Sequence, residues 1–294
     1  MAGVLWSYAR IPLFATSGLV GLLSSALYYY QNELIYPRNL PVGARTEVPK
    51  PEQFGITEYE DLRITTPDQE TLHAYLIKPP NPQHARSITL LMFHGNAGNI
   101  GHRLPIAKVL SNDLACNVLM LQYRGYGFST GDPGEKGIAI DAQAGFDYVK
   151  QRADLKDTKL VIYGQSIGGA VGIGLAAANV EKGIAGIILE NTFLSIAKMI
   201  PSVMPAAKWL TPLCHEKWPS EEYIPVIKDT PILFLSGLKD EIVPPWHMKE
   251  LYSLCKARTK VWRELPHGDH NNTVAESAYF HYIEEFLRIH IMSQ

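Results

Sequence analysis

Cysteine is scarce in this chain, and no two cysteines form a C-x-x-C pair. Cys116, Cys214 and Cys255 are an odd and sparse set that fits neither a disulfide framework nor a thiolate zinc site. The sequence also lacks an H-E-x-x-H motif and any cluster of His, Cys and Asp with the spacing of metal ligands. We therefore expect neither a metal nor a cofactor.

The chain also lacks an excess of charge of either sign. It has 27 Lys and Arg residues and 29 Asp and Glu residues, which gives a net charge of −2. Proteins that bind nucleic acid need a clustered positive surface, so we expect no nucleic-acid partner.

Hydrophobic residues make up 46% of the chain, which is enough for a large core and excludes disorder as the main state. The length of 294 residues fits one large domain or two small ones.

The longest uncharged apolar run lies near the N-terminus, between Ile11 and Asn32. A helix of that length, at about 1.5 Å per residue, spans roughly 33 Å, close to the bilayer's hydrocarbon thickness of about 30 Å. Aromatic residues flank it, with Tyr8 before it and residues 28–30 near its end, as in the interfacial belts of membrane helices. The sequence predicts a single-pass transmembrane anchor over residues 1–32, and therefore a membrane protein whose partner is the lipid bilayer.

Two other interpretations of this segment stay open. A signal peptide could be cleaved after the small residues 24–26, or the helix could be buried or lie along a surface. Arg10 on one side and Arg38 and Arg45 on the other are too few charges to set the orientation. Residues 33–57 contain four prolines and are expected to form a linker.

From residue 58 onward, apolar β-branched runs alternate with longer helix-like stretches. The expected strands are 58–66, 72–78, 88–94, 118–123, 160–164, 184–190, 232–237 and 261–265. The expected helices are 102–112, 135–152, 167–180, 245–257 and 273–290. This order predicts one doubly wound α/β domain over residues 58–294, with a mostly parallel eight-stranded sheet covered by helices on both faces. Ligands of such sheets bind beyond the carboxyl ends of the strands.

A serine stands at the end of one of these strands, within residues 164–168 (G-Q-S-I-G). In the G-x-S-x-G pattern a sharp strand-to-helix turn exposes the serine oxygen, and the glycines leave room for a strained backbone and a close helix. The start of the following helix also directs free N–H groups at the site. A pentapeptide of this pattern also occurs by chance, so by itself it is modest evidence. Its position between a predicted strand and a predicted helix favours Ser166 as a nucleophile.

A carboxylate stands after a later strand, where the acid that orients a catalytic histidine is expected. Asp240 is the preferred residue because it follows strand 232–237 and precedes a helix. Glu241 and Glu190 are alternative acids. Asp240 could instead only cap the next helix.

Two histidines compete for the role of base after the last expected strand. His270 is preferred because it lies next to a helix start, in a loop that could fold back over the serine, and His267 is the alternative. Ser166, Asp240 and His270 then follow the chain order typical of this kind of sheet enzyme.

Small residues follow the strand at 88–94, in the run His94-Gly95-Asn96-Ala97-Gly98-Asn99. Backbone N–H groups in such a turn can face a developing oxyanion. We expect the backbone N–H groups of Asn96 and Ile167 to form the oxyanion hole and His94 to be structural, although the run could be only a turn. Residues 123–129 are Gly-rich but lack the phosphate-loop pattern, and are interpreted as a scaffold turn beside the site.

Four short runs together resemble the α/β-hydrolase superfamily, in particular its membrane-anchored eukaryotic ABHD branch with the fungal bud-emergence homologues. They are residues 94–98 (H-G-N-A-G), 123–127 (Y-R-G-Y-G), 164–169 (G-Q-S-I-G-G) and 268–271 (G-D-H-N). The resemblance covers about residues 58–290 and implies the α/β-hydrolase fold, with Ser166 as nucleophile, His270 as base and Asp240 as acid. Asn272 stands where an Asp is expected after the histidine motif, which affects no member of this triad.

The resemblance also implies an activity: hydrolysis of carboxylic esters or thioesters through an acyl-enzyme. Relatives in the wider branch remove palmitoyl groups from proteins, so a lipid ester or an acylated protein is the expected substrate. Residues 193–230 are expected to form a short helical cap, whose Met199, Met204 and Trp209 suit a fatty acyl chain. The same residues could instead simply cover the sheet.

Two rival functions remain at this point. The fold could be an inactive, membrane-tethered binding module, although a binder has no need for all three triad groups. It could also be a serine peptidase, since G-x-S-x-G-G occurs in oligopeptidases, but no additional domain selects peptides. Residues 271–273 form a glycosylation sequon beside the proposed base, which favours a cytosolic site or an unused sequon.

Overall fold

Eight strands form one sheet in the computed structural model, which describes residues 2–293 and their side chains except at 2–17, 207 and 210. The strands are β1 (Tyr59–Thr65), β2 (Thr71–Ile77), β3 (Ile88–Phe93), β4 (Asn117–Leu121), β5 (Lys159–Gln165), β6 (Ile184–Glu190), β7 (Ile232–Gly237) and β8 (Lys260–Leu265). Their order across the sheet is β1-β2-β4-β3-β5-β6-β7-β8. Only β1 with β2 and β2 with β4 pair antiparallel, and all other neighbours are parallel. The predicted mostly parallel eight-stranded sheet is confirmed.

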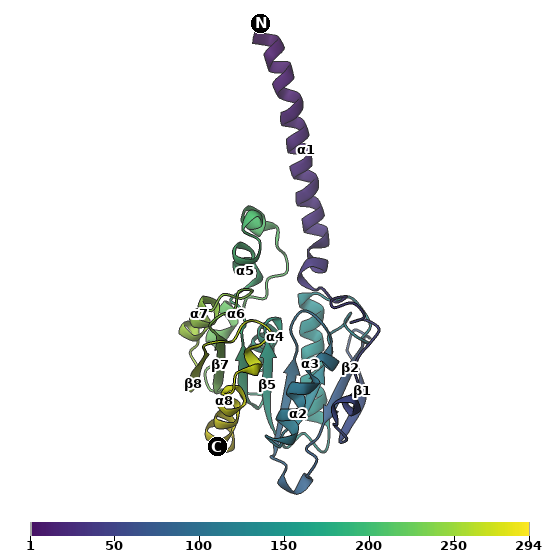
Figure 1. The fold of residues 1–294 in the computed structure, drawn as a ribbon, viewed down its shortest axis with the longest axis vertical. Helices are drawn as coiled ribbons and strands as arrows, with labels where there is room; N and C mark the ends of the chain where they lie inside the picture. The colour runs from purple at the N-terminus through teal and green to yellow at the C-terminus, as the bar shows by residue number, and fades with distance from the viewer. Residues whose placement is uncertain (1, 294) are drawn as a thin grey trace.

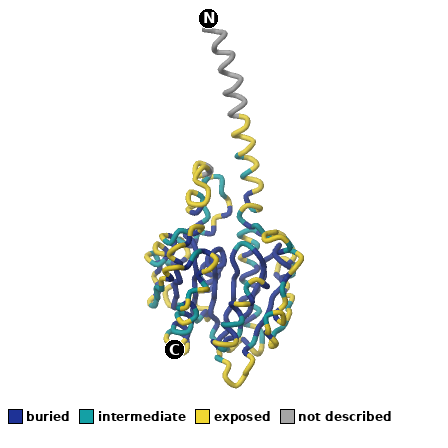
Figure 2. The backbone as a smooth tube through the Cα atoms, in the orientation of Figure 1, coloured by how far each residue is buried: buried dark blue, intermediate teal, exposed yellow. Residues whose placement is uncertain are grey.

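Helices cover both faces of this sheet (Figure 1). One apolar core joins the sheet to α3 (Glu135–Gln151), α4 (Ile167–Ala178) and α7 (Trp246–Leu254). A second core joins the other face to α2 (Leu104–Asn112) and α8 (Tyr279–Phe286). Figure 2 shows the central strands as the buried middle of the molecule, while the edge strands β1 and β8 are more exposed. Because side chains alternate between the faces of a strand, the nearly all-apolar strands supply both cores.

The last helix begins later than predicted. The sequence pattern indicated 273–290, whereas residues 273–275 form a short 3-10 turn and α8 begins at Tyr279, followed by a π-helix over Leu287–Met292. The hydroxyl of Thr273 donates to the backbone carbonyl of Asp269 four residues earlier. This bond holds the chain in a turn that belongs to the loop around His270, so the helix starts only after that loop is complete.

Short helical pieces lie above the sheet in the region predicted as a cap. They are α5 (Ile196–Val203), a 3-10 segment over Pro205–Leu213, α6 (Ser220–Tyr223) and a 3-10 turn over Ile224–Val226. Prolines at 201, 205, 212 and 219 interrupt helical hydrogen bonding, which explains why no long helix forms here. In Figure 1, α5 lies above the sheet near the base of α1.

The N-terminal helix α1 (Ala2–Ile35) projects from the globular part, and its last turns meet that part (Figure 1). The predicted transmembrane anchor over residues 1–32 lies partly outside the described side chains, which begin at residue 18 in this helix. From residue 18 on, no helix in the described chain is both long and apolar enough to cross a membrane. Several apolar side chains of α1 are nevertheless exposed: Leu19, Val20, Leu22 and Leu23.

Hydrogen bonds connect the base of α1 to the cap. The side chain of Gln31 donates to the backbone carbonyl of Leu213 at 3.2 Å and accepts from the N–H of His215 at 2.9 Å. Immediately after the helix, the buried Tyr36 hydroxyl donates to Glu216 and accepts from the indole of Trp218. The direction in which α1 leaves the domain is therefore set by these contacts.

The segment expected to be a linker, residues 33–57, lies against the domain. Its Tyr36, Ala44, Val48 and Ile56 are buried. Backbone carbonyls of Leu40, Ala44 and Glu47 accept hydrogen bonds from residues 98 and 99. The segment thus supports the loop after β3, where the sequence predicts an oxyanion hole.

Three histidines are buried as neutral groups, which predicts a loss of stability in mild acid. Burial lowers the pKa of His73 to about 4, of His94 to about 3 and of His247 to about 4, whereas an unfolded histidine has a pKa of about 6.5. Below pH 6.5 the unfolded chain therefore binds more protons than the folded one, and the free energy of unfolding falls. Each histidine contributes a slope of up to about 1.4 kcal/mol per pH unit.

Urea unfolding at pH 7, 6 and 5 tests this with His73→Leu, which removes one buried titrating group whose Nε2 lies 3.1 Å from Oδ1 of Asp61. We expect the variant's stability to fall less steeply between pH 6 and 5, by about 1 kcal/mol per unit. His84→Leu, at an exposed position, is the control and keeps the wild-type slope. An unchanged slope in His73→Leu would contradict the assignment.

Candidate active site

The junction between β5 and α4 holds Ser166 in a strained backbone conformation. Its φ is 55° and its ψ is −120°, a region that residues other than glycine rarely occupy. A Cβ on Gly164 would lie 2.2 Å from the carbonyl oxygen of Gly168, and one on Gly168 would lie 2.2 Å from that of Phe93. The strand and helix therefore approach too closely for any side chain at either glycine. This turn presents the Ser166 hydroxyl at the carboxyl edge of the sheet.

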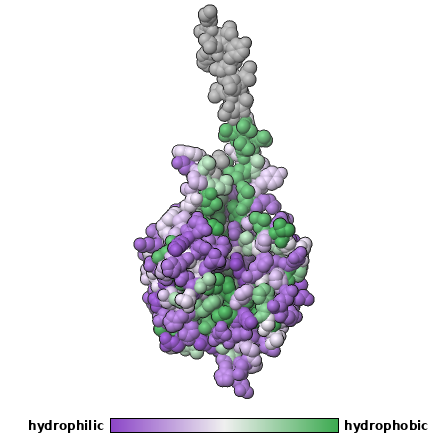
Figure 3. Space-filling view, viewed as in Figure 1, coloured by the Kyte–Doolittle hydropathy of each residue, from purple (hydrophilic) through white to green (hydrophobic). Residues whose placement is uncertain are grey.

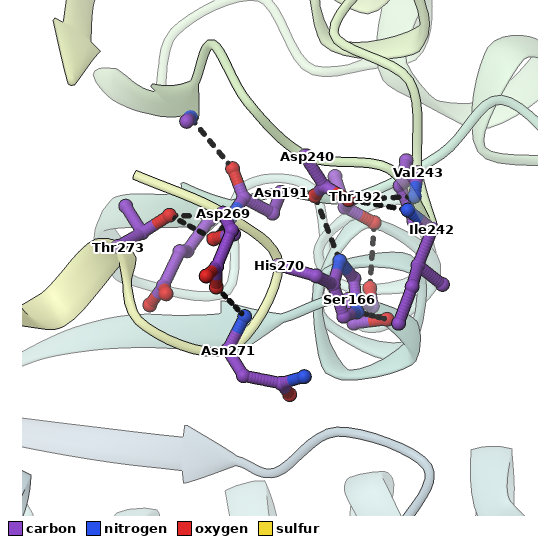
Figure 4. A network of polar contacts seen from close by, with 12 residues as sticks. Ser166, Asn191, Thr192, Asp240, Ile242, Val243, Asp269, His270, Asn271 and Thr273 are labelled. Atoms are coloured by element: carbon purple, nitrogen blue, oxygen red, sulfur yellow. Dashed lines mark hydrogen bonds and ion pairs between the residues drawn. The ribbon is translucent and has the colours of Figure 1, made fainter. Parts of the chain in front are cut away.

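Three predicted residues from three strand ends meet at this turn (Figure 4). The Nδ1 of His270 donates to Oδ2 of Asp240 at 2.7 Å, and its Nε2 lies 3.1 Å from Oγ of Ser166. A carboxylate partner at Nδ1 holds the ring in the tautomer whose Nε2 can accept the serine proton. All three residues are buried, with exposed fractions of 7%, 5% and 7% for Ser166, Asp240 and His270.

Asp240 makes two further hydrogen bonds, and neither is a helix cap. Its Oδ1 accepts from the backbone N–H groups of Ile242 at 3.0 Å and Val243 at 2.7 Å, whereas α7 begins only at Trp246. These bonds occupy one carboxylate oxygen and leave the other for His270. The loop after β7 thus orients the Asp240 carboxylate toward Nδ1 of His270.

The alternative residues lie elsewhere. His267 and Glu241 are exposed, and no side-chain hydrogen bond of either is found in the described chain. Glu190 is buried at the end of β6, where it accepts from Tyr163, Tyr279 and Gln165. Burial raises the pKa of this carboxyl above its usual value. Because its oxygens face these three donors, Glu190 supports the turn from below rather than orienting His270.

The His270 loop is fixed by Asn191, which follows β6 (Figure 4). Its amide donates to the hydroxyl of Thr273 at 2.8 Å and to the carbonyl of Asp269 at 3.2 Å, while its Oδ1 accepts from the N–H of Gly237 at 2.8 Å. One side chain therefore joins the loops that carry the acid and the histidine. No sequence pattern pointed to Asn191, because a single Asn after a strand is an ordinary turn residue.

The expected oxyanion donors, Asn96 and Ile167, line one cavity with Ser166. No hydrogen bond from either backbone N–H is found among the described residues, and Ile167 is the first residue of α4, where N–H groups lack helical partners. The side chain of Asn96 donates to the carbonyl of Ile35 at 3.2 Å. The oxyanion loop is thus attached directly to the end of α1.

Buried side chains hold this loop from below. The Nδ1 of His94 donates to the carbonyl of Gly95 at 2.6 Å and its Nε2 accepts from Gln122, which fits the neutral ring implied by its lowered pKa. Tyr123 and Tyr126 donate to the carbonyls of His94 and Asn96 at 2.9 and 2.8 Å. His94 is structural, and the Gly-rich turn at 123–129 supports the site as expected.

A cavity of about 360 Å³ opens over Ser166. Met199 and Met204 line it, as expected, together with other residues of the cap. Trp209 does not, since its side chain is 79% exposed and stacks with Lys208 on the outside of the cap. The short 3-10 segment that carries Trp209 turns this ring toward solvent, so the expectation that it binds substrate is corrected.

Two contributions to the cavity were not predicted. Leu34 and Ile35, at the end of α1, form part of its wall, and Arg103 lies at the start of α2. Sequence patterns placed Leu34 and Ile35 in the linker at 33–57 and Arg103 in an ordinary helix at 102–112. In the part of the chain that the structure describes, no group of three or more His, Cys, Asp and Glu could hold a metal ion.

Comparisons with known proteins agree with this architecture. A family model described as the alpha/beta hydrolase fold matches residues 88–213. Protein bem46 of Schizosaccharomyces pombe is 45% identical over 293 residues, covering 98% of this chain and 97% of its own. The uncharacterized membrane protein YNL320W of Saccharomyces cerevisiae is 41% identical over 285 residues, covering 97% of this chain and 98% of its own.

Among solved structures, an esterase of Pyrococcus furiosus superposes with a TM-score of 0.68 at 21% identity, covering 82% of this chain and 94% of the esterase. At that identity the likeness concerns the fold alone. The two fungal relatives, in contrast, match along nearly the whole chain, including the N-terminal helix. The chain therefore belongs to the α/β-hydrolase superfamily, in the branch of the fungal bud-emergence homologues.

Proposed function

We propose that this protein is a serine hydrolase that cleaves carboxylic esters or thioesters of long-chain acyl groups. The observation that carries the proposal is the chain of contacts from Ser166 Oγ to His270 Nε2 at 3.1 Å and from His270 Nδ1 to Asp240 Oδ2 at 2.7 Å. A purely structural role would not require a strained serine that faces a cavity together with an acid-oriented base. This supports an enzyme over an inactive binding module.

The proposed reaction follows from these positions. His270 takes the proton of Ser166 as its Oγ attacks the acyl carbonyl, and Asp240 stabilises the charged ring. The backbone N–H groups of Asn96 and Ile167 stabilise the oxyanion of the tetrahedral intermediate. His270 then protonates the leaving alcohol or thiol, and water, activated by the same ring, releases the acid from the acyl-enzyme.

The shape of the cavity supports a long-chain acyl group. A smaller apolar cavity of about 80 Å³ between α1 and the cap shares part of its walls with the cavity over Ser166. The shared residues are Leu34, Ile35, Ile196, Ile200 and Met204. Figure 3 shows apolar surface on the base of α1 where the helix meets the globular part. An acyl chain that starts at Ser166 can run between these walls, excluded from water.

We also propose that α1 attaches the enzyme to a membrane. Its exposed apolar side chains, the uncharged run from Ile11 to Asn32, and a relative whose name calls it a membrane protein support this. Attachment through α1 would place the wall formed by Leu34 and Ile35 next to the lipid, where acyl substrates are concentrated.

Labelling by a fluorophosphonate probe tests the triad, because the probe reacts with an activated serine whatever the natural substrate. We expect wild type to label, Ser166→Ala to be unreactive, and His270→Ala and Asp240→Asn to react at least about 10³-fold more slowly. His267→Ala is the matched control and keeps the wild-type rate. Folded wild type that never labels would refute the proposed function, and labelling that survives in His270→Ala would make His267 the base.

Chain-length preference tests the acyl site. In Ile200→Trp the larger side chain fills the space between α1 and α5, so we expect kcat/KM for a dodecanoyl thioester to fall about 10-fold or more relative to an acetyl thioester. Trp209→Ala, outside the cavity, leaves the preference unchanged. Equal losses for both substrates in Ile200→Trp would contradict an acyl site at this place.

Membrane attachment is tested by fractionating cells that express the full chain. We expect the protein to stay with membranes after washing with alkaline carbonate, because apolar burial does not depend on charge. The double variant Leu22→Lys with Leu23→Lys should shift to the supernatant, since charged residues in an apolar stretch are costly to bury in lipid. Release of the wild type by salt alone would argue against attachment through α1.

A further inference from the structure

Arg103 is a charged residue in an otherwise largely apolar cavity. It lies where the turn over Ile100–Arg103 meets the start of α2, and its side chain lines the cavity over Ser166. A Cβ placed on Gly95 would lie 3.5 Å from Nη2 of Arg103, 3.8 Å from Oε1 of Gln165 and 3.9 Å from Cβ of Ser166. The guanidinium therefore stands beside the oxyanion loop, close to the reacting serine. Among the described residues that line this cavity, it is the only Arg, Lys, Asp or Glu.

This guanidinium has no partner in the described structure. Its Nε is buried without a hydrogen bond, and no hydrogen bond or ion pair from any nitrogen of Arg103 is found. Other arginines of low exposure have partners: Arg124 pairs with Asp68 and Asp141, Arg152 pairs with Glu60 and Asp154, and Arg45 donates to backbone carbonyls. A cation that is partly withdrawn from water without an anion costs free energy, so a ligand that supplied the anion would complete the site.

The buried carboxylate of Glu190 does not supply this partner. The charge of Arg103 acts on Glu190, but no hydrogen bond or ion pair joins the two residues in the described chain. The oxygens of Glu190 accept instead from Tyr163, Gln165 and Tyr279. The guanidinium thus remains available to a group inside the cavity.

We infer that Arg103 binds an anionic group, a carboxylate or a phosphate, on the alcohol or thiol part of the substrate. The inference rests on the proposed hydrolase function and specifies its substrate as an anionic amphiphile. The walls from α1 and α5 are apolar and take the acyl chain, so the charged group must lie on the other side of the scissile carbonyl. Arginine suits this role because its planar fork of donors matches both carboxylate and phosphate oxygens.

Matched substrates separate this role from a general effect on catalysis. Three dodecanoyl thioesters differ only in the thiol: 2-mercaptoethanol is neutral, mercaptoacetate carries a carboxylate, and 2-mercaptoethyl phosphate carries a phosphate. We expect the ratio of kcat/KM for an anionic over the neutral thioester to fall about 10- to 100-fold in Arg103→Gln relative to wild type, since hydrogen bonds to charged groups contribute about 1.5–3 kcal/mol. Intrinsic reactivities of the thioesters cancel in this comparison, and the larger of the two ratios identifies the preferred anion.

Two further variants complete the series. Arg103→Lys retains the charge and is expected to keep part of the preference. Arg258→Gln removes an arginine that is 84% exposed and paired with Asp229 outside the cavity, and is expected to keep the wild-type ratio. An equal loss for neutral and anionic thioesters in Arg103→Gln would overturn the inference, because Arg103 would then act on the oxyanion or on the fold. An unchanged ratio would overturn it as well.

A second measurement uses only the wild type, in case Arg103→Gln does not fold. Dodecyl phosphate or dodecanoate should slow fluorophosphonate labelling of Ser166 at a concentration at least about 10-fold lower than dodecanol does, and added salt should reduce this difference. Equal protection by all three would overturn the inference. Labelling of Ser166 in the absence of any competitor reports separately on the proposed hydrolase function, so the two failures are distinguishable.

Discussion

The close contact between β5, α4 and β3 at Ser166 is the constraint on which the rest of the site depends. The glycines on either side have no room for a Cβ, and the serine between them takes a φ of 55°. Such a backbone is stable only where its surroundings leave no alternative. Here the buried strands on both sides and the first turn of α4 supply those surroundings. The hydroxyl is consequently presented at the carboxyl edge of the sheet, where it lies 3.1 Å from Nε2 of His270.

The residues that contact Ser166 lie on loops after other strands, and hydrogen bonds between side chains and backbone join these loops to one another. Asp240 uses one oxygen to shape its own loop and the other to hold His270, while Asn191 connects the acid loop to the histidine loop. On the opposite side, two tyrosines and the neutral His94 hold the oxyanion loop. These hydrogen bonds run between loops, so each loop is held by its neighbours as well as by its own backbone.

The N-terminal helix is part of this arrangement. Asn96 of the oxyanion loop donates to the carbonyl of Ile35, and Gln31 and Tyr36 join the base of the helix to the cap. Leu34 and Ile35 then form a wall of the cavity. The end of the N-terminal helix therefore shapes the cavity over Ser166 directly, and the oxyanion loop and the cap are both joined to it.

The sequence by itself determined the sheet, the turn at Ser166 and the chain order of serine, acid and histidine. These depend on local rules: apolar runs form buried strands, and glycines permit a tight turn. Only the tertiary structure placed His270, and not His267, within hydrogen-bond distance of Ser166 and Asp240, left Trp209 outside the cavity, and brought Ile35 and Arg103 to its wall. Those outcomes depend on which loop ends meet in space, and residues more than sixty positions apart, such as Ile35 and Asn96, leave no periodic signal of their contact.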